Sequence, residues 1–115
     1  MAGKLSRKFS CGVELALEVL GGKWKPVILA HLKEGALRYA ELRRRIPRMC
    51  EKMLSQRLRE LVESGLLAHS AGSYRLTERG DRARKALGAL HSFGETLVPE
   101  LGVRIESNAS RRAKS

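Results

Sequence analysis

Apolar residues recur along this chain with two different spacings, and the order of the spacings restricts the fold more than any other feature. They recur at the helical period over residues 12–20, 23–33, 39–45 and 51–64. The period changes at 66–70 and 73–77, two short segments joined by Ala71-Gly72, which we interpret as a β-hairpin. Helical spacing returns at Glu78, after Thr77, a residue type that caps helix N-termini well. The sequence therefore predicts four helices, a small hairpin and a long last helix.

Glycine and proline mark where the predicted helices end. The residues that follow the first four helices are Gly21-Gly22, Gly35, Pro47 and Gly65. The last helix contains or meets four residues of the same kind: Gly88, Gly94, Pro99 and Gly102. Because these residues weaken helices, we expect bends or breaks beyond residue 90.

The composition excludes several classes of protein. A chain of 115 residues has the size of one domain and is too short for two. No apolar run approaches the roughly 18 residues of a membrane span, so we expect no membrane association. The start is polar and basic, without a secretory signal, and two cysteines cannot build a disulfide framework. Together these features indicate the reducing environment of a cytoplasm.

Patterns that would indicate an enzyme or a metal protein do not occur. The sequence has no phosphate-binding glycine loop, nucleophile elbow or carboxylate pair, so we expect neither enzymatic activity nor a cofactor. His31, His69 and His91 lie far apart, and none pairs with a cysteine at metal-ligand spacing. We therefore expect no metal site.

The positive charge is concentrated in three places. The chain carries 23 Lys and Arg against 12 Asp and Glu, a net charge of +11. Residues 1–10 and 107–115 hold three cations each and no acid, whereas 38–59 holds eight cations and two acids. We divide the chain into a basic arm (1–10), a folded domain (11–106) and a disordered basic tail (107–115). A concentrated block of this kind is typical of a protein that binds a polyanion.

The predicted order of elements is that of a winged helix-turn-helix. The fold class that we expect is mainly α with a small β-hairpin, with N- and C-terminal dimerisation helices added to the winged domain. The third and fourth helices are separated by about five residues around Pro47, which fits the turn of a helix-turn-helix. The second helix of such a pair enters the major groove, so double-stranded DNA is the expected partner.

The fourth helix has an apolar side and a polar side. Its leucines fall on one side at about 100° per residue. The residues expected to read base edges lie on the opposite side: Lys52, Ser55, Gln56 and Arg59. The residues expected to hold phosphates or brace the motif are Arg43, Arg44, Arg45, Arg48, Arg57 and Arg75.

An ordered series of motifs resembles the HxlR-type family of bacterial winged-helix regulators over about residues 9–95. The motifs are Cys11-Gly12-Val13-Glu14, Gly21-Gly22-Lys23-Trp24-Lys25-Pro26, Glu41-Leu42-Arg43-Arg44, Lys52-Met53-Leu54-Ser55-Gln56-Arg57-Leu58, Gly65-Leu66 and Tyr74-Arg75-Leu76-Thr77-Glu78-Arg79-Gly80. The resemblance implies a homodimer joined through its first and last helices and bound to an inverted-repeat operator. It also implies a regulator, mostly a repressor, acting in the bacterial cytoplasm on the nucleoid, and it gives Cys11 a role in sensing oxidants or electrophiles.

The chain departs from the family pattern at three points. The hairpin tip, residues 70–73, is short and uncharged, although family members usually have a longer tip that contains proline. Cys50 replaces a residue of the serine type before the fourth helix, and Gly12 replaces a proline. The resemblance also implies that the hairpin lies near a minor groove. A tip this short and uncharged does not by itself predict contact with the groove.

Both cysteines are candidates for redox sensing. Cys50 lies at the start of the fourth helix between Arg48 and Lys52, and a helix N-terminus with flanking cations favours the reactive thiolate. Oxidation there would disturb the DNA-reading helix. The alternative is that Cys50 and Cys11 are inert small residues. The sequence assigns no small-molecule effector.

An apolar stripe on the last helix suggests a partner chain. A long terminal helix in so small a domain has little of its own chain left to contact, although the stripe could also be intramolecular core. The residues predicted at a dimer interface are Val13, Leu17, Leu87, Leu90, Leu97 and Leu101.

Two other functions remain open at this point. One is an architectural or RNA-associated nucleic-acid-binding protein without operator specificity, and the other is a protein-interaction module on the same fold. Trp24 and Tyr39 fit core or helix packing better than base stacking.

Overall fold

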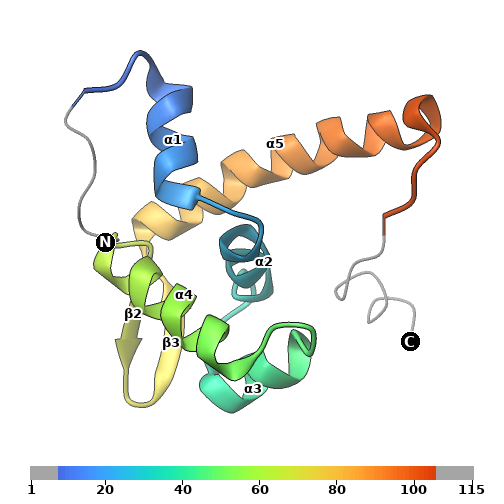
Figure 1. Ribbon diagram of the computed structural model, residues 1–115. Coiled ribbons are helices and arrows are strands. Elements are labelled where there is room, and N and C mark those ends of the chain that lie inside the picture. Colours follow the sequence, from blue (N-terminus) through green and yellow to red (C-terminus); the bar gives the residue numbers. More distant parts are fainter. Residues whose placement is uncertain (1–7, 106–115) are drawn as a thin grey trace.

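A computed structural model describes residues 8–105 of the chain (Figure 1). The helices are α1 (Gly12–Leu20), α2 (Trp24–His31), α3 (Tyr39–Arg45), α4 (Glu51–Glu63) and α5 (Glu78–Leu101). The strands are β1 (Leu37–Arg38), β2 (Leu67–Ser70) and β3 (Ser73–Leu76). The expected tail and most of the expected basic arm lie outside the described residues. Within 8–105, no helix combines the length and the apolar character needed to cross a bilayer.

The predicted fold class is confirmed. The protein is mainly α-helical, α3 and α4 form the helix-turn-helix, and β2 and β3 form the hairpin, called the wing below. The sheet has a third strand that the sequence did not indicate, because the two residues of β1 are too few to show a period. β1 pairs antiparallel with β3, so that the strand order is β1-β3-β2. This pairing attaches the wing to the start of α3.

One prediction about α5 is wrong. Bends or breaks are expected beyond residue 90, but the helix is continuous from Glu78 to Leu101. Gly88 and Gly94 each cost about 1 kcal/mol in a helix interior, too little to end a helix of this length. Pro99 lies in the last turn, and the helix ends soon after it at Gly102, which has the left-handed conformation that favours glycine.

The core lies between α2, α3, α4 and the base of the wing. Its fully buried side chains are Ile28, Leu29, Leu32, Leu42, Ile46, Met49, Leu54, Leu58, Leu61 and Leu66. Burying one such side chain contributes about 1.5–3 kcal/mol before the entropic cost of folding. Because the leucines of α4 are all directed into this core, the opposite side of α4 is turned outward.

One corner of the fold joins α4, the wing and α5. Gly65 ends α4 in the left-handed conformation (φ 82°), and the Leu66 N–H donates to the Leu61 carbonyl at 2.9 Å. The Thr77 hydroxyl accepts from the Gly80 N–H at 3.0 Å and donates to the Gly65 carbonyl at 2.6 Å. A Cβ at Gly80 would lie only 2.0 Å from the Leu66 carbonyl oxygen, so this close approach requires glycine. The start of α5 is therefore fixed to the end of α4.

α1 and the far half of α5 extend away from the winged domain (Figure 1). Leu20, the last residue of α1, is the buried residue of that helix, while Val13 and Leu17 are exposed. Leu90, Phe93 and Leu101 on α5 are exposed as well. Two helices thus present apolar side chains that the winged domain does not cover.

Candidate nucleic-acid interface

The turn between α3 and α4 is held from inside. Ile46 and Met49 are fully buried, and the Met49 N–H donates to the Ile46 carbonyl at 3.2 Å. Nη1 of Arg43 donates to the Met49 carbonyl at 2.7 Å. Arg43, predicted to hold phosphate or brace the motif, is therefore half-buried and braces the turn. These contacts fix the angle at which α4 leaves α3.

The outer side of α4 carries the four residues predicted to read bases. Lys52, Ser55 and Arg59 are exposed and lie along one line of the helix, and Gln56 is half-buried at its flank. The structure therefore brings the four residues together on one surface, called the α4 outer face below. Their role in reading bases stays a prediction.

A tyrosine hydroxyl reaches the α4 outer face from α3. Ser55 Oγ donates to the Tyr39 hydroxyl oxygen at 3.3 Å, and this hydroxyl donates to the Glu51 carbonyl at 3.2 Å. Because the Ser55 proton is used in this chain of hydrogen bonds, the Ser55 oxygen is left to act as an acceptor. From the sequence, Tyr39 is expected to pack rather than to stack on bases. Its place as the first residue of the basic α3 is the signal that could have indicated more.

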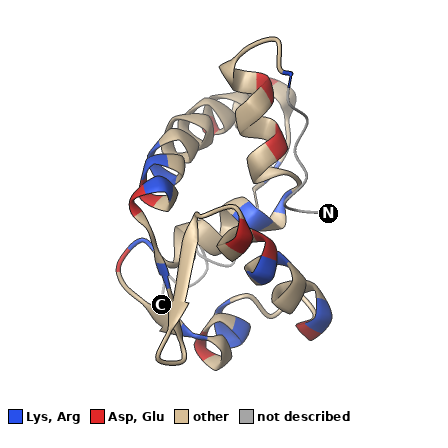
Figure 2. Ribbon diagram, turned by 90° about the vertical axis from the view of Figure 1, so that its left-hand side faces the viewer, with Lys and Arg blue, Asp and Glu red and all other residues tan. Residues whose placement is uncertain are grey.

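The predicted phosphate-binding arginines differ in their surroundings. Arg44, Arg48 and Arg75 are exposed, and Arg45 is half-buried. Figure 2 shows Lys and Arg on both helices of the motif, with fewer Asp and Glu among them. The exposed members of the set can approach a phosphate without breaking an internal contact.

Arg57 instead belongs to an ion-pair cluster between α2 and α4. Its Nη1 lies 2.5 Å from Oε1 of Glu60, and Nζ of Lys25 lies 3.3 Å from the same oxygen. Burial acts to raise the pKa of Glu60, but the hydrogen bonds and charges of Arg57 and Lys25 outweigh it and hold this pKa below its ordinary value. The Lys25–Glu60 pair therefore links α2 to α4, and Glu60 holds Arg57 against α4 itself.

The wing is short, and a cation from β1 lies at its tip. Ala71 and Gly72 both have positive φ (52° and 80°), as in the tight two-residue turns that match strand twist. A Cβ at Gly72 would lie 2.7 Å from Nη1 of Arg38, so the guanidinium of Arg38 covers the turn. Farther down the wing, the rings of His69 and Tyr74 stack with centroids 4.0 Å apart. The tip itself, residues 70–73, has no charged residue, but the guanidinium of Arg38 from β1 places a positive charge beside it.

Each cysteine precedes a helix. Cys50 is the N-cap residue of α4 and Cys11 that of α1, and neither thiol makes a capping hydrogen bond. Both are exposed and free. Reagents in solution can therefore reach both thiols in the described chain.

The residues predicted at a dimer interface are mostly uncovered. Val13 and Leu101 are 68% and 65% exposed, and Leu17 and Leu90 are also exposed. Leu97 is half-buried, and Leu87 packs partly against the core of its own chain. Phe93, 62% exposed on α5, is a candidate that the sequence analysis did not single out. Whether a second copy covers these side chains stays a prediction.

As for metal ligands, residues 8–105 contain no group of three or more His, Cys, Asp and Glu placed to hold an ion.

Comparison of the sequence with known families gives one clear match. A model of HxlR-like helix-turn-helix proteins matches residues 19–101. An HTH-type transcriptional regulator of Methanothermobacter thermautotrophicus is 40% identical over 95 residues, which span 76% of this chain and 72% of the relative. The HTH-type transcriptional regulator YtcD of Bacillus subtilis is 40% identical over 99 residues, 80% and 79% of the two chains.

Solved structures of regulators resemble the fold. The reduced form of the redox regulator HypR matches with a TM-score of 0.70 and 32% identity, over 80% of this chain and 98% of HypR. Quinone-bound YodB of Bacillus subtilis matches with a TM-score of 0.68 and 28% identity, over 73% and 96% of the two chains.

Proposed function

Since this chain belongs to the HxlR-like helix-turn-helix family and is a transcriptional regulator of the winged helix-turn-helix type, we propose that it represses transcription as a homodimer on an inverted-repeat operator. Double-stranded DNA is the binding partner, and the bacterial cytoplasm, on the nucleoid, is the place of action. DNA binding requires neither a cofactor nor a metal in this proposal.

The α4 outer face is the observation that carries the proposal. Lys52, Ser55 and Arg59 extend from it as donors and acceptors of the kinds that match base edges in the major groove, with Gln56 beside them. The buried leucines on the other side of α4 fix this orientation. Arg44 and Arg48 flank the face as exposed cations that would neutralise phosphates on either side of the groove.

The uncovered helices support the homodimer. Covering the apolar side chains of α1 and α5 with a second copy removes them from water, at about 25 cal/mol per Å² of apolar surface. A two-fold axis between the copies would place the two α4 helices in half-sites about one helical turn of DNA apart, roughly 34 Å, or a multiple of it.

Cys11 and Cys50 would make the regulator responsive to oxidants or electrophiles. The names of two similar structures, the redox regulator HypR and quinone-bound YodB, describe such chemistry in those proteins. Here the exposed thiol of Cys50 lies at the first residue before the DNA-reading helix. A bulky or charged adduct at that point would disturb the approach of α4 to DNA. If a double Cys→Ser variant retains the full response of operator affinity to hydrogen peroxide and benzoquinone, this part of the proposal is wrong.

The experiment that tests the proposal begins with DNA selected from a random pool. We expect the selected duplex to contain an inverted repeat and to compete at least about 10³-fold better than random duplex of equal length. Arg59→Ala and Gln56→Ala should each cost about 1–3 kcal/mol on the selected site and relax its sequence preference. Arg82→Ala, at an exposed cation of α5, is the matched control and should leave affinity unchanged.

Two results would contradict the proposal. Equal affinity for selected and random duplexes would favour an architectural or RNA-associated protein without operator specificity. Unchanged operator affinity of Arg59→Ala would remove the α4 outer face from the reading surface.

A further inference from the structure

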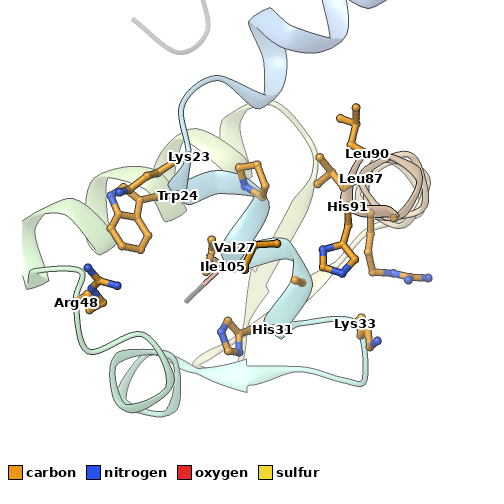
Figure 3. A pocket seen from close by; sticks show the side chains of 14 residues that line it. Lys23, Trp24, Val27, His31, Lys33, Arg48, Leu87, Leu90, His91 and Ile105 are labelled. Atoms are coloured by element: carbon orange, nitrogen blue, oxygen red, sulfur yellow. The ribbon is translucent and has the colours of Figure 1, made fainter. Parts of the chain in front are cut away.

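A pocket of about 710 Å³ lies between α2 and α5 (Figure 3). Trp24 and Val27 come from α2, and Leu87 and Leu90 come from α5. The volume falls within the roughly 300–1,000 Å³ of typical small-molecule sites, which are also lined mainly by apolar side chains. The pocket therefore has the size and the walls of a ligand site.

Positive charge surrounds these apolar walls. Four cations line the pocket, and among the described lining residues none is acidic: Lys23, Lys33, Arg48 and Arg84. Arg84 already has a partner, because it donates to Asp81 at 2.9 Å. Lys33 lies just after α2 and Arg48 lies in the helix-turn-helix turn, so the cations approach the pocket from different segments. Such an arrangement attracts an anion and disfavours a cation.

We propose that this pocket binds a small apolar carboxylate, a molecule with an aromatic or aliphatic body and one anionic head. The body packs between Trp24 and Leu87, where it is removed from water. The carboxylate lies toward the rim, within reach of Lys33 or Arg48. This ligand class combines the two properties that the lining residues share, apolar walls and unbalanced positive charge.

The chain segment after Ile105 is a poorer occupant. Ile105 itself lines the pocket. However, residues 106–115 carry Arg111, Arg112 and Lys114 against one acid, Glu106, a net charge of +2. Like charges therefore oppose the entry of this segment among the cations of the pocket.

The position of the pocket gives its ligand a way to affect DNA binding. Arg48 lies in the turn two residues before Cys50, the N-cap of α4, while Leu90 lies on the helix that we assign to the dimer. A ligand that contacts both the turn and α5 would shift the N-terminal end of α4, whose other end is fixed to α5 at the Thr77–Gly80 corner. This consequence, unlike the binding site itself, rests on the proposed function.

The binding test needs the full chain and no DNA. Trp24 is the single tryptophan of the protein, so its fluorescence reports occupancy directly. The probes are 4-phenylbutyrate and its uncharged counterpart 4-phenylbutyramide. We expect saturable binding of the carboxylate, by fluorescence and calorimetry, and about threefold to tenfold weaker binding of the amide.

A matched pair of variants locates the charge. Lys33→Gln should remove most of the preference for the carboxylate, whereas Lys85→Gln should leave it intact, because Lys85 lies on α5 outside the pocket and pairs with Asp81. Equal binding of acid and amide, equal effects of the two variants, or no saturable binding would each overturn the site. None of these results touches the operator proposal. Unchanged operator affinity at saturating 4-phenylbutyrate would overturn only the coupling to DNA.

Discussion

At the scale of single residues, the contact between Tyr39 and Ser55 makes a hydroxyl outside α4 part of the proposed reading surface. Tyr39→Phe keeps the ring in place and removes the oxygen that receives the Ser55 proton. Ser55 is then free to rotate, so we expect operator affinity to fall by about 1 kcal/mol, the value of one hydrogen bond. Competition binding with the selected duplex measures this loss.

A double-mutant cycle separates this role from a merely structural one. In a Ser55→Ala background, Tyr39→Phe should cost less than it does in the wild type, because the bond from Ser55 is already absent and only the bond to the Glu51 carbonyl is left to remove. Tyr74→Phe is the control, since Tyr74 stacks on His69 through its ring. Additive losses from Tyr39→Phe and Ser55→Ala would show that the two side chains act independently.

At the scale of elements, the N-terminus of α4 lacks a good cap. The thiol of Cys50 makes no capping hydrogen bond, whereas a serine hydroxyl at the same position accepts one from the backbone. We expect Cys50→Ser to raise the free energy of unfolding by about 0.5–1 kcal/mol, measured by urea denaturation. Cys50→Ala removes the thiol without supplying a cap, so an equal gain from this variant would contradict the explanation.

The cluster around Glu60 makes the contact between α2 and α4 sensitive to acid. Because the pKa of Glu60 is lowered in the folded protein, its contribution is present above the ordinary value of 4.5 and is lost as the pH falls through the folded pKa. Glu60→Gln should cost about 0.5–1 kcal/mol at pH 7 and make the acid side of the stability profile less steep. Glu63→Gln, exposed on the same helix, is the control. Parallel profiles of wild type and Glu60→Gln between pH 7 and pH 3 would show that the cluster does not contribute.

Prediction from the sequence succeeds where a pattern extends over many residues. The leucines of α4 repeat over about two turns, so its inner side is predictable from the sequence, and Gly65 marks its end by a local rule. β1 and the Arg38 guanidinium at the wing tip depend on contacts between distant segments, which leave no period in the sequence. The ion pairs of Glu60 with Arg57 and with Lys25 are of the same kind. A basic residue on a helix looks the same in the sequence whether its side chain is free or paired.

At the scale of the whole molecule, α1 and α5 decide whether the protein is a monomer or a dimer. Because each copy contributes Leu17 to the proposed two-fold interface, Leu17→Asp introduces two charges there. With about 1.5–3 kcal/mol lost for each leucine, the dissociation constant should rise about a hundredfold or more. Sedimentation equilibrium measures the change, and Ala36→Asp, exposed in the loop before β1, is the control. A Leu17→Asp protein that sediments as the wild type does would exclude this helix from the interface.

The corner at Thr77 and Gly80 gives the long helix a mechanical property. α5 is fixed at one end to the junction of α4 and the wing, and its other end extends far from that junction (Figure 1). This attachment lies beside both α4 and the wing, and farther along the helix Leu87 packs against the core. A partner bound to the exposed far half of α5 is therefore connected to the DNA-facing elements through the Thr77–Gly80 corner as well as through the leucine-rich interior.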